Sequence, residues 1–126
     1  MKPEDLQTFL EEAGFTWPMR AHELPTSPDT CIAIAGYAGI AGRMKEDSGL
    51  PRDDQPRFQI LVRSKDDLEA SLAASDIHDA IHVRFADVGE VRVFRMEAEQ
   101  RPFLRRNLDP IRFVYSFNIS AWVLRS

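Results

Sequence analysis

The sequence has 126 residues, a net charge of −4 and a hydrophobic fraction of 44%. This length suits one domain, residues 1–126, and the composition is that of a folded globular protein and not of a disordered chain. The acidic balance argues against general nucleic-acid binding, which needs a basic surface. There is no apolar run of about 20 residues, the length of a membrane-spanning helix. The single cysteine, Cys31, excludes an internal disulfide framework and, together with an N-terminus that lacks a signal-peptide pattern, predicts a reducing cytosol.

Charge is distributed unevenly along the chain. Residues 1–30 carry two positive and six negative side chains, a local balance of −4, and residues 101–112 carry four arginines and one aspartate, a local balance of +3. Two solvated surfaces would produce this pattern. Alternatively, the two patches meet across a contact between subunits, because opposite charges orient association.

The first predicted element is a helix over residues 4–13. Apolar side chains recur at helical spacing from Leu6 to Ala13, which gives the helix one apolar face. Pro3 suits its first turn, where a missing N–H costs nothing, and Gly14 suits the left-handed position after its end.

A proline-rich segment, residues 24–29, cannot form a regular helix and leads into a short apolar strand at residues 31–34. Residues 36–57 then hold four of the six glycines and equal numbers of positive and negative side chains. A loop of this length inside a compact domain is usually functional or disordered, so we interpret it as a mobile arm or hairpin. A simple flexible insertion is the alternative. If the arm binds a partner, its residues Arg43 and Lys45 are candidate contacts.

A second strand and a second helix follow the arm. Residues 58–63 alternate apolar and polar side chains, as a half-buried strand requires. A helix is predicted from Ser64 to about His82, with the Ser64 hydroxyl capping its first turn and Asp67 as the acidic partner of a capping box.

The second helix has two different faces. One face carries small and apolar side chains that can pack closely on a sheet: Ala70, Ala73, Ala74, Ile77 and Ile81. Leu68 and Leu72 fall on the other side. Exposed leucines are common, but these two are candidate residues of a contact surface.

Residues 91–98 are predicted to form a third strand. Three of its side chains share one face: Phe94, Met96 and Ala98. The loop at residues 99–110 is rich in arginine, and Arg101, Arg105 and Arg106 are candidate partner-binding residues.

The last strand, residues 113–121, shows the clearest alternation of apolar and polar side chains. Its length favours a central place in the sheet. The predicted fold is therefore α+β, with a mostly antiparallel sheet of about four strands and helices packed on one face.

The sequence predicts no catalytic, cofactor-binding or metal site. His78 and His82 have the i, i+4 spacing that can bind zinc, but no motif supplies a third ligand. Cys31 lies within an apolar strand, which is typical of a small core residue. The glycine-rich segment 36–42 lacks the pattern of a phosphate-binding or dinucleotide-binding loop.

Several short motifs occur in a fixed order: Leu24–Asp29 before the Cys31–Ile34 strand, Tyr37–Gly39, Gln59–Arg63 before the alanine-rich helix, Arg101–Leu104, and Phe113–Ile119 with Asn118. In order and spacing, from about residue 4 to 123, they resemble bacteriophage minor capsid proteins of the tail terminator type. The chain departs from that pattern at residues 108–110, where Leu-Asp-Pro replaces a D-x-x-G turn.

This resemblance implies a virion structural protein, assembled in the bacterial cytoplasm, with no enzymatic activity and no cofactor. Its partners would be other copies of itself in a ring of six, the tail tube protein and the head connector or completion protein. The ring would cap the head-proximal end of the tail tube. Neither a membrane nor a specific nucleic-acid sequence is an expected partner.

Two alternatives remain open at this stage. The chain could be a different head–tail joining or completion protein with a similar ring. From another class, it could be a small ligand-binding or metal-binding enzyme-like domain that uses Cys31 or the pair His78 and His82. That alternative predicts a pocket and tight binding of a metal or small molecule.

Overall fold

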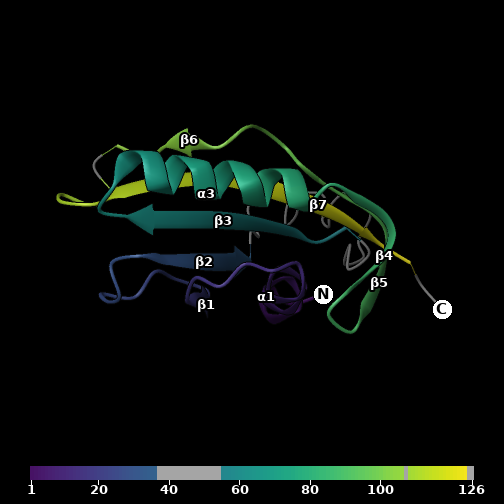
Figure 1. Cartoon of the computed structure of the whole chain (residues 1–126). Helices are drawn as coiled ribbons and strands as arrows, with labels where there is room; N and C mark the ends of the chain where they lie inside the picture. The colour runs from purple at the N-terminus through teal and green to yellow at the C-terminus, as the bar shows by residue number, and fades with distance from the viewer. Residues whose placement is uncertain (37–54, 107, 125–126) are drawn as a thin grey trace, which may run out of the picture.

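The computed structural model describes residues 1–36, 55–106 and 108–124, which form two helices and one seven-stranded sheet (Figure 1). The elements in chain order are α1 (Pro3–Glu12), β1 (Met19–Ala21), β2 (Cys31–Gly36), β3 (Arg57–Ser64), α3 (Asp67–Ala80), β4 (Val83–Val88), β5 (Val91–Ala98), β6 (Phe103–Leu104) and β7 (Phe113–Val123). The strand order is β1-β2-β3-β7-β5-β4, and β6 also pairs with β7.

The α+β class is confirmed, but the sheet is larger than the four mostly antiparallel strands predicted. In the described part of the chain it has seven strands, and β1 pairs with β2 in parallel, so the sheet is mixed. Three strands were not predicted. β1 and β6 have only two or three residues, too few to show alternation, and the apolar side chains of β4 do not alternate regularly over Val83–Val88. β7 does lie centrally, between β3 on one edge and β5 with β6 on the other.

The predicted arm at residues 36–57 is shorter at both ends than the sequence indicated. Gly36 ends β2, Arg57 begins β3, and Gly36 lies opposite Phe58 in the antiparallel register of these two strands. Residues 37–54 lie outside the described part of the chain, and with them the candidate contacts Arg43 and Lys45.

The second helix begins later than predicted. Ser64 is the last residue of β3, and Asp66 is the N-cap, because its carboxylate accepts a hydrogen bond from the backbone N–H of Glu69 (3.1 Å). The Ser64 hydroxyl supports this turn by accepting from the N–H of Asp66 (3.1 Å) and donating to the Glu69 carboxylate (2.9 Å). The helix ends at Ala80, two residues before the predicted end.

Both helices contribute to one core. The apolar face predicted for α3 is confirmed, since Ala70, Ala74, Ile77 and Ile81 are fully buried. The core also contains Leu6 and Leu10 of α1 and the inward side chains of the central strands: Ile32, Ile34, Phe58, Ile60, Val62, Phe117, Ile119 and Ala121. α3 lies along β3 and β7, and α1 contacts β1, β2 and β4 (Figure 1). Because α1 touches both outer parts of the sheet, the sheet must curve around the core.

The face predicted for β5 is correct for Met96 and Ala98, which lie in or against the core, but wrong for Phe94. A register shift between Val93 and Arg95 places Val93 and Met96 in the core and turns Phe94 outward. Such a bulge adds one residue to one strand and so reverses the side on which the following residues lie. Simple alternation cannot reveal it.

The tip of the β4–β5 hairpin is fastened to α1 by Asp5. One carboxylate oxygen of Asp5 accepts from the backbone N–H of Glu90 (3.3 Å), and the other accepts from the N–H of Lys2 (2.8 Å). Gly89 has a φ of 61°, in the left-handed region. Because it has no side chain, Asp5 can occupy the space beside it.

We expect Gly89→Ala to be more destabilising than Gly14→Ala. Both glycines have positive φ, so each substitution costs about 1–2 kcal/mol of backbone strain. An added Cβ at Gly89 would also lie within 2.7 Å of three Asp5 atoms, whereas at Gly14 nothing lies within 4 Å. The overlap should add about 1–3 kcal/mol. Urea denaturation of both variants measures the difference, and equal losses would contradict the proposed docking of the hairpin on α1.

Arg112 joins the proline-rich loop before β2 to the loop before β7. Its guanidinium donates to the carboxylate of Asp109 (2.8 Å), to the carboxylate of Asp29 (3.2 Å) and to the carbonyl of Thr26 (2.8 Å). The Arg112 side chain is only 14% exposed, so the proline-rich loop and the loop before β7 are joined by a charge that is largely removed from water.

The two carboxylates joined by Arg112 titrate at lower pH than usual. Hydrogen bonding from Lys65, together with that from Arg112, lowers the pKa of Asp29. Burial acts to raise the pKa of Asp109, but the N–H groups of Ile111 and Arg112 and the Arg112 guanidinium outweigh it, so this pKa is also lowered. Both groups therefore stay ionised in the folded protein below their ordinary value of 3.8.

We expect Arg112→Gln to lower the free energy of unfolding at pH 7 by about 2 kcal/mol or more, because Asp109 loses the cation that it binds and Asp29 keeps only Lys65. Carboxylates whose pKa is lowered by folding stabilise the protein above their unfolded pKa of 3.8, and that contribution is lost as the pH falls through the lowered values. The difference between variant and wild type should therefore shrink below a pH of about 4. Chemical denaturation at pH 7 and pH 3 tests this, with the exposed Arg106→Gln as the control. A difference that is unchanged at pH 3 would contradict the assignment.

Candidate functional site

The structure gathers three of the arginines predicted to bind a partner along the segment that contains β6. We call Arg101, Phe103, Arg105 and Arg106 the arginine strip. Arg101 and Arg106 are exposed, Arg105 is half-buried, and the Phe103 side chain is 46% exposed. The strip thus presents one aromatic ring among three cations, a composition that is typical of protein–protein contacts.

Backbone hydrogen bonds hold the strip against the edge of β7. The N–H of Glu99 donates to the carbonyl of Asn118 (2.8 Å), and the N–H of Arg105 donates to the carbonyl of Val114 (2.7 Å). Between them, Phe103 pairs with Ser116. The strip is therefore attached to the central strand, and its side chains have a defined direction.

Two acidic side chains on neighbouring elements bind groups other than the arginines of the strip. Arg57 binds Glu99, and this hydrogen bond holds the pKa of that carboxyl below its usual value. Asp67 accepts a hydrogen bond from the Tyr115 hydroxyl (2.6 Å), which raises the pKa of Tyr115. Arg105 itself lies 6.0 Å from the centre of the Phe103 ring and donates to the Ser116 hydroxyl at 3.4 Å.

The acidic side chains of the N-terminal region fall into two groups, those that bind other groups of the same subunit and those that are exposed to solvent. Asp5 and Asp29 are occupied by the hairpin tip and by the loops that Arg112 joins. Glu4, Glu11 and Glu12 remain exposed along α1. In Figure 1, β6 lies above β3 and β2 and α1 lies below them, so the acidic helix and the arginine strip occupy separate parts of the surface.

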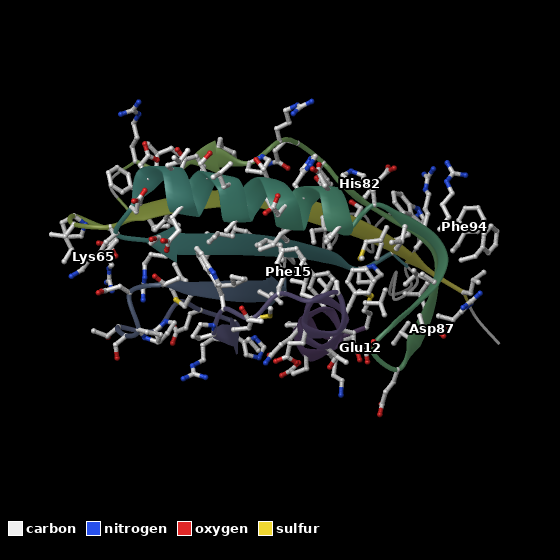
Figure 2. The ribbon with its side chains drawn as sticks, viewed as in Figure 1. Glu12, Phe15, Lys65, His82, Asp87 and Phe94 are labelled. Carbon is white, nitrogen blue, oxygen red and sulfur yellow. The ribbon has the colours of Figure 1, made fainter. Side chains whose placement is uncertain are left out.

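A groove lies between α3 and the segment that follows α1. Its volume is about 310 Å³, and Phe15 and Trp17 form one wall with Leu72 on the other. Ile32 forms the floor, and Phe15 lies between α1 and α3 (Figure 2). We call it the Phe15 groove.

The two leucines predicted on the outer side of α3 therefore differ. Both are exposed, Leu68 by 67% and Leu72 by 56%, but only Leu72 lines the groove. Sequence reasoning missed Phe15 and Trp17, although two aromatic residues directly after the Gly14 helix stop were an available signal.

A second exposed aromatic group lies on the β4–β5 hairpin. The rings of Phe85 and Phe94 meet edge to face with centres 5.0 Å apart. Phe85 has a positive φ of 48°, an uncommon conformation for a bulky residue, and Phe94 lies at the register shift of β5. In Figure 2, Phe94 is labelled at the right-hand edge of the molecule, away from Phe15 near its centre.

The contacts of the histidines and the cysteine do not favour the metal-binding or enzymatic alternative. His82 places Nδ1 2.7 Å from the carbonyl of His78, and its Nε2 accepts from the N–H of Ala98 at 3.3 Å. Burial raises the pKa of the Cys31 thiol, which disfavours the reactive thiolate. Among the described residues, no cluster of three or more His, Cys, Asp or Glu side chains could hold a metal ion.

In the described part of the chain, no helix combines the length and the apolar character needed to span a membrane.

Comparison with known proteins gives one family and one informative structural relative. The model of a family described as bacteriophage tail terminator proteins matches residues 9–123. A chain in the solved structure of the virion of a native gene transfer agent particle is similar in fold, with a TM-score of 0.55 and 15% sequence identity. The match covers 95% of this chain and 89% of that chain. No curated protein sequence matches.

Proposed function

This chain belongs to the family of bacteriophage tail terminator proteins, and on that basis we propose that it caps the head-proximal end of the tail tube as a ring of six subunits. The ring joins the tube to the head connector or completion protein. The family is one of virion structural proteins, and the chain acts by binding and not by catalysis. Assembly takes place in the cytoplasm of the bacterial host, and the finished ring is part of the virion.

The observation that carries this proposal is the separation of opposite charges on one subunit. The arginine strip follows β6, and the exposed glutamates belong to α1, which lies apart from β6 with β3 and β2 between them in Figure 1. Two complementary surfaces on different sides of one molecule favour a head-to-tail contact. Such a contact closes into a ring when the rotation from one subunit to the next is a whole fraction of a full turn. A self-complementary patch would instead favour a two-fold dimer.

A ring of this kind explains how tube growth ends. One face of the ring binds the last layer of tube subunits. The other face differs from the end of the tube, so a further tube subunit finds no surface to bind. The Phe85–Phe94 pair is a candidate for one of these axial contacts, because exposed aromatic clusters are frequent at protein interfaces. The connector and the tube protein are the partners that we propose for the two faces.

A different head–tail joining protein could use a similar ring at a neighbouring position. The two roles differ in what happens when the protein is missing. Loss of a terminator leaves tubes of uncontrolled length, whereas loss of a joining or completion protein leaves tubes of normal length beside unjoined heads. Electron microscopy of particles made without this protein distinguishes the two.

We expect the purified protein to form a closed hexamer as its concentration rises, because each subunit carries both halves of the contact. Native mass spectrometry across a concentration series measures the stoichiometry. Immunogold labelling of assembled particles should place the protein at the head–tail junction. Label confined to the capsid surface or to the distal end of the tail would refute the proposed role.

We expect the double variant Arg101→Glu/Arg106→Glu to weaken assembly by about tenfold or more at low salt, since like charges would then face each other across the contact. These two arginines are exposed, so the fold should not change. Arg84→Glu/Arg92→Glu, on the β4–β5 hairpin, makes the same change in net charge and is the matched control. Equal effects of the two double variants in sedimentation velocity would show that net charge, and not the arginine strip, governs assembly.

A further inference from the structure

We propose that Phe103 of one subunit inserts into the Phe15 groove of a second copy of this chain, and that this contact, repeated head to tail, joins neighbouring subunits. The inference rests on the proposed ring and specifies its interface. It is carried by the shape and lining of the groove, by the exposure of Phe103, and by the charges around both.

The groove has an apolar interior and an acidic rim. Glu69, Leu72, Ala73 and Asp76 form its α3 wall at i, i+3, i+4 and i+7, one continuous stripe of that helix. Leu72 is 56% exposed and contributes the apolar part of this wall. Among the described residues that line the groove, none is a lysine or an arginine. Its best occupant is therefore an apolar side chain with cations beside it.

Phe103 meets that description. Its ring is 46% exposed, and it stands on β6 between Arg101 and Arg105, with Arg106 one residue further along. Backbone pairing of β6 with β7 fixes the position of the ring before binding, so little freedom is lost when the contact forms. An aromatic anchor that enters an apolar pocket, with arginines at its edge, is the common arrangement at energetically dominant interface positions.

The occupant must come from another subunit. In Figure 1, β6 lies on one side of α3, and in Figure 2 Phe15 lies on the other side, between α3 and α1. Phe103 therefore cannot reach the groove of its own subunit. A second copy supplies the complementary cations, and its own groove remains free for a third.

Two single variants test the two halves of the contact. Phe103→Ala removes the aromatic anchor, and Leu72→Glu places a charge in the groove. Each should raise the concentration at which half of the protein is assembled by about tenfold or more. Leu68→Glu is the matched control for the groove, since Leu68 is exposed on the same helix one turn earlier and does not line it. Leu124→Ala is the control for the anchor, because Leu124 is an apolar side chain of similar exposure (41%) that belongs to no proposed contact. Both controls should assemble like wild type.

A mixture of the two defective variants gives a sharper test. A Leu72→Glu subunit keeps Phe103, and a Phe103→Ala subunit keeps the groove, so the mixture should form one-to-one heterodimers that grow no further. Native mass spectrometry resolves these heterodimers by mass. Circular dichroism and thermal denaturation verify that each variant is folded. Should Phe103→Ala fail to fold, Leu72→Glu against Leu68→Glu tests the groove alone.

The outcomes separate this contact from the proposed function. If the wild type forms rings and both variants form them equally well, the Phe103 contact is wrong, while the ring itself stands. A wild type that stays monomeric at every concentration also overturns the contact. In that case, the terminator role is decided by the location of the protein in assembled particles and by the length of tails made without it.

Discussion

β7 is the strand on which the rest of the structure depends. It spans Phe113–Val123 and forms hydrogen bonds along both edges, with β3 on one side and with β5 and β6 on the other. Its alternating pattern places Phe117, Ile119 and Ala121 in the core. The helix α3 packs on the same core, so a one-residue slip of β7 would exchange its buried and outward side chains.

The arginine strip is a consequence of the length of β7. β5 pairs with residues 119–123 of β7, and only residues 115 and 116 pair with β6. The chain leaves β5 at Ala98 and runs along the remaining edge of β7, where Pro102 lacks an N–H to donate. Short pairing leaves the side chains of this segment facing outward. A surface built on the edge of the central strand is rigid enough to carry specificity, which is what a ring with a fixed rotation per subunit requires.

Charge is used for two different purposes in this chain. Arg112, Asp29 and Asp109 form a contact within the subunit that holds two loops together. Arg101, Arg106 and the glutamates of α1 remain in water. An exposed ion pair contributes little to stability, but complementary exposed charges on two molecules raise the rate and the specificity of association. The charges left outside are thus better suited to assembly than to folding.

The sequence by itself determined the elements with a clear period. The helix after Pro3, the strands that contain Ile32, Ile60 and Phe117, and the buried face of α3 follow from local alternation or helical spacing, since those patterns depend only on neighbouring residues. The exposure of Leu68 and Leu72 followed in the same way. The family was also recognisable from the order of short motifs, and the match over residues 9–123 confirms it.

Only the tertiary structure decided which of these residues meet. The bulge that turns Phe94 outward, the two-residue β6 and the parallel β1 depend on partners far away in the sequence. The local spacing of apolar residues therefore does not predict them. The Phe15 groove has the same origin, because Leu72 approaches Phe15 only when α1 and α3 pack on one core. Local sequence specifies which face of an element is apolar, but the surface formed where two elements meet is set by how they pack, and that is a property of the whole fold.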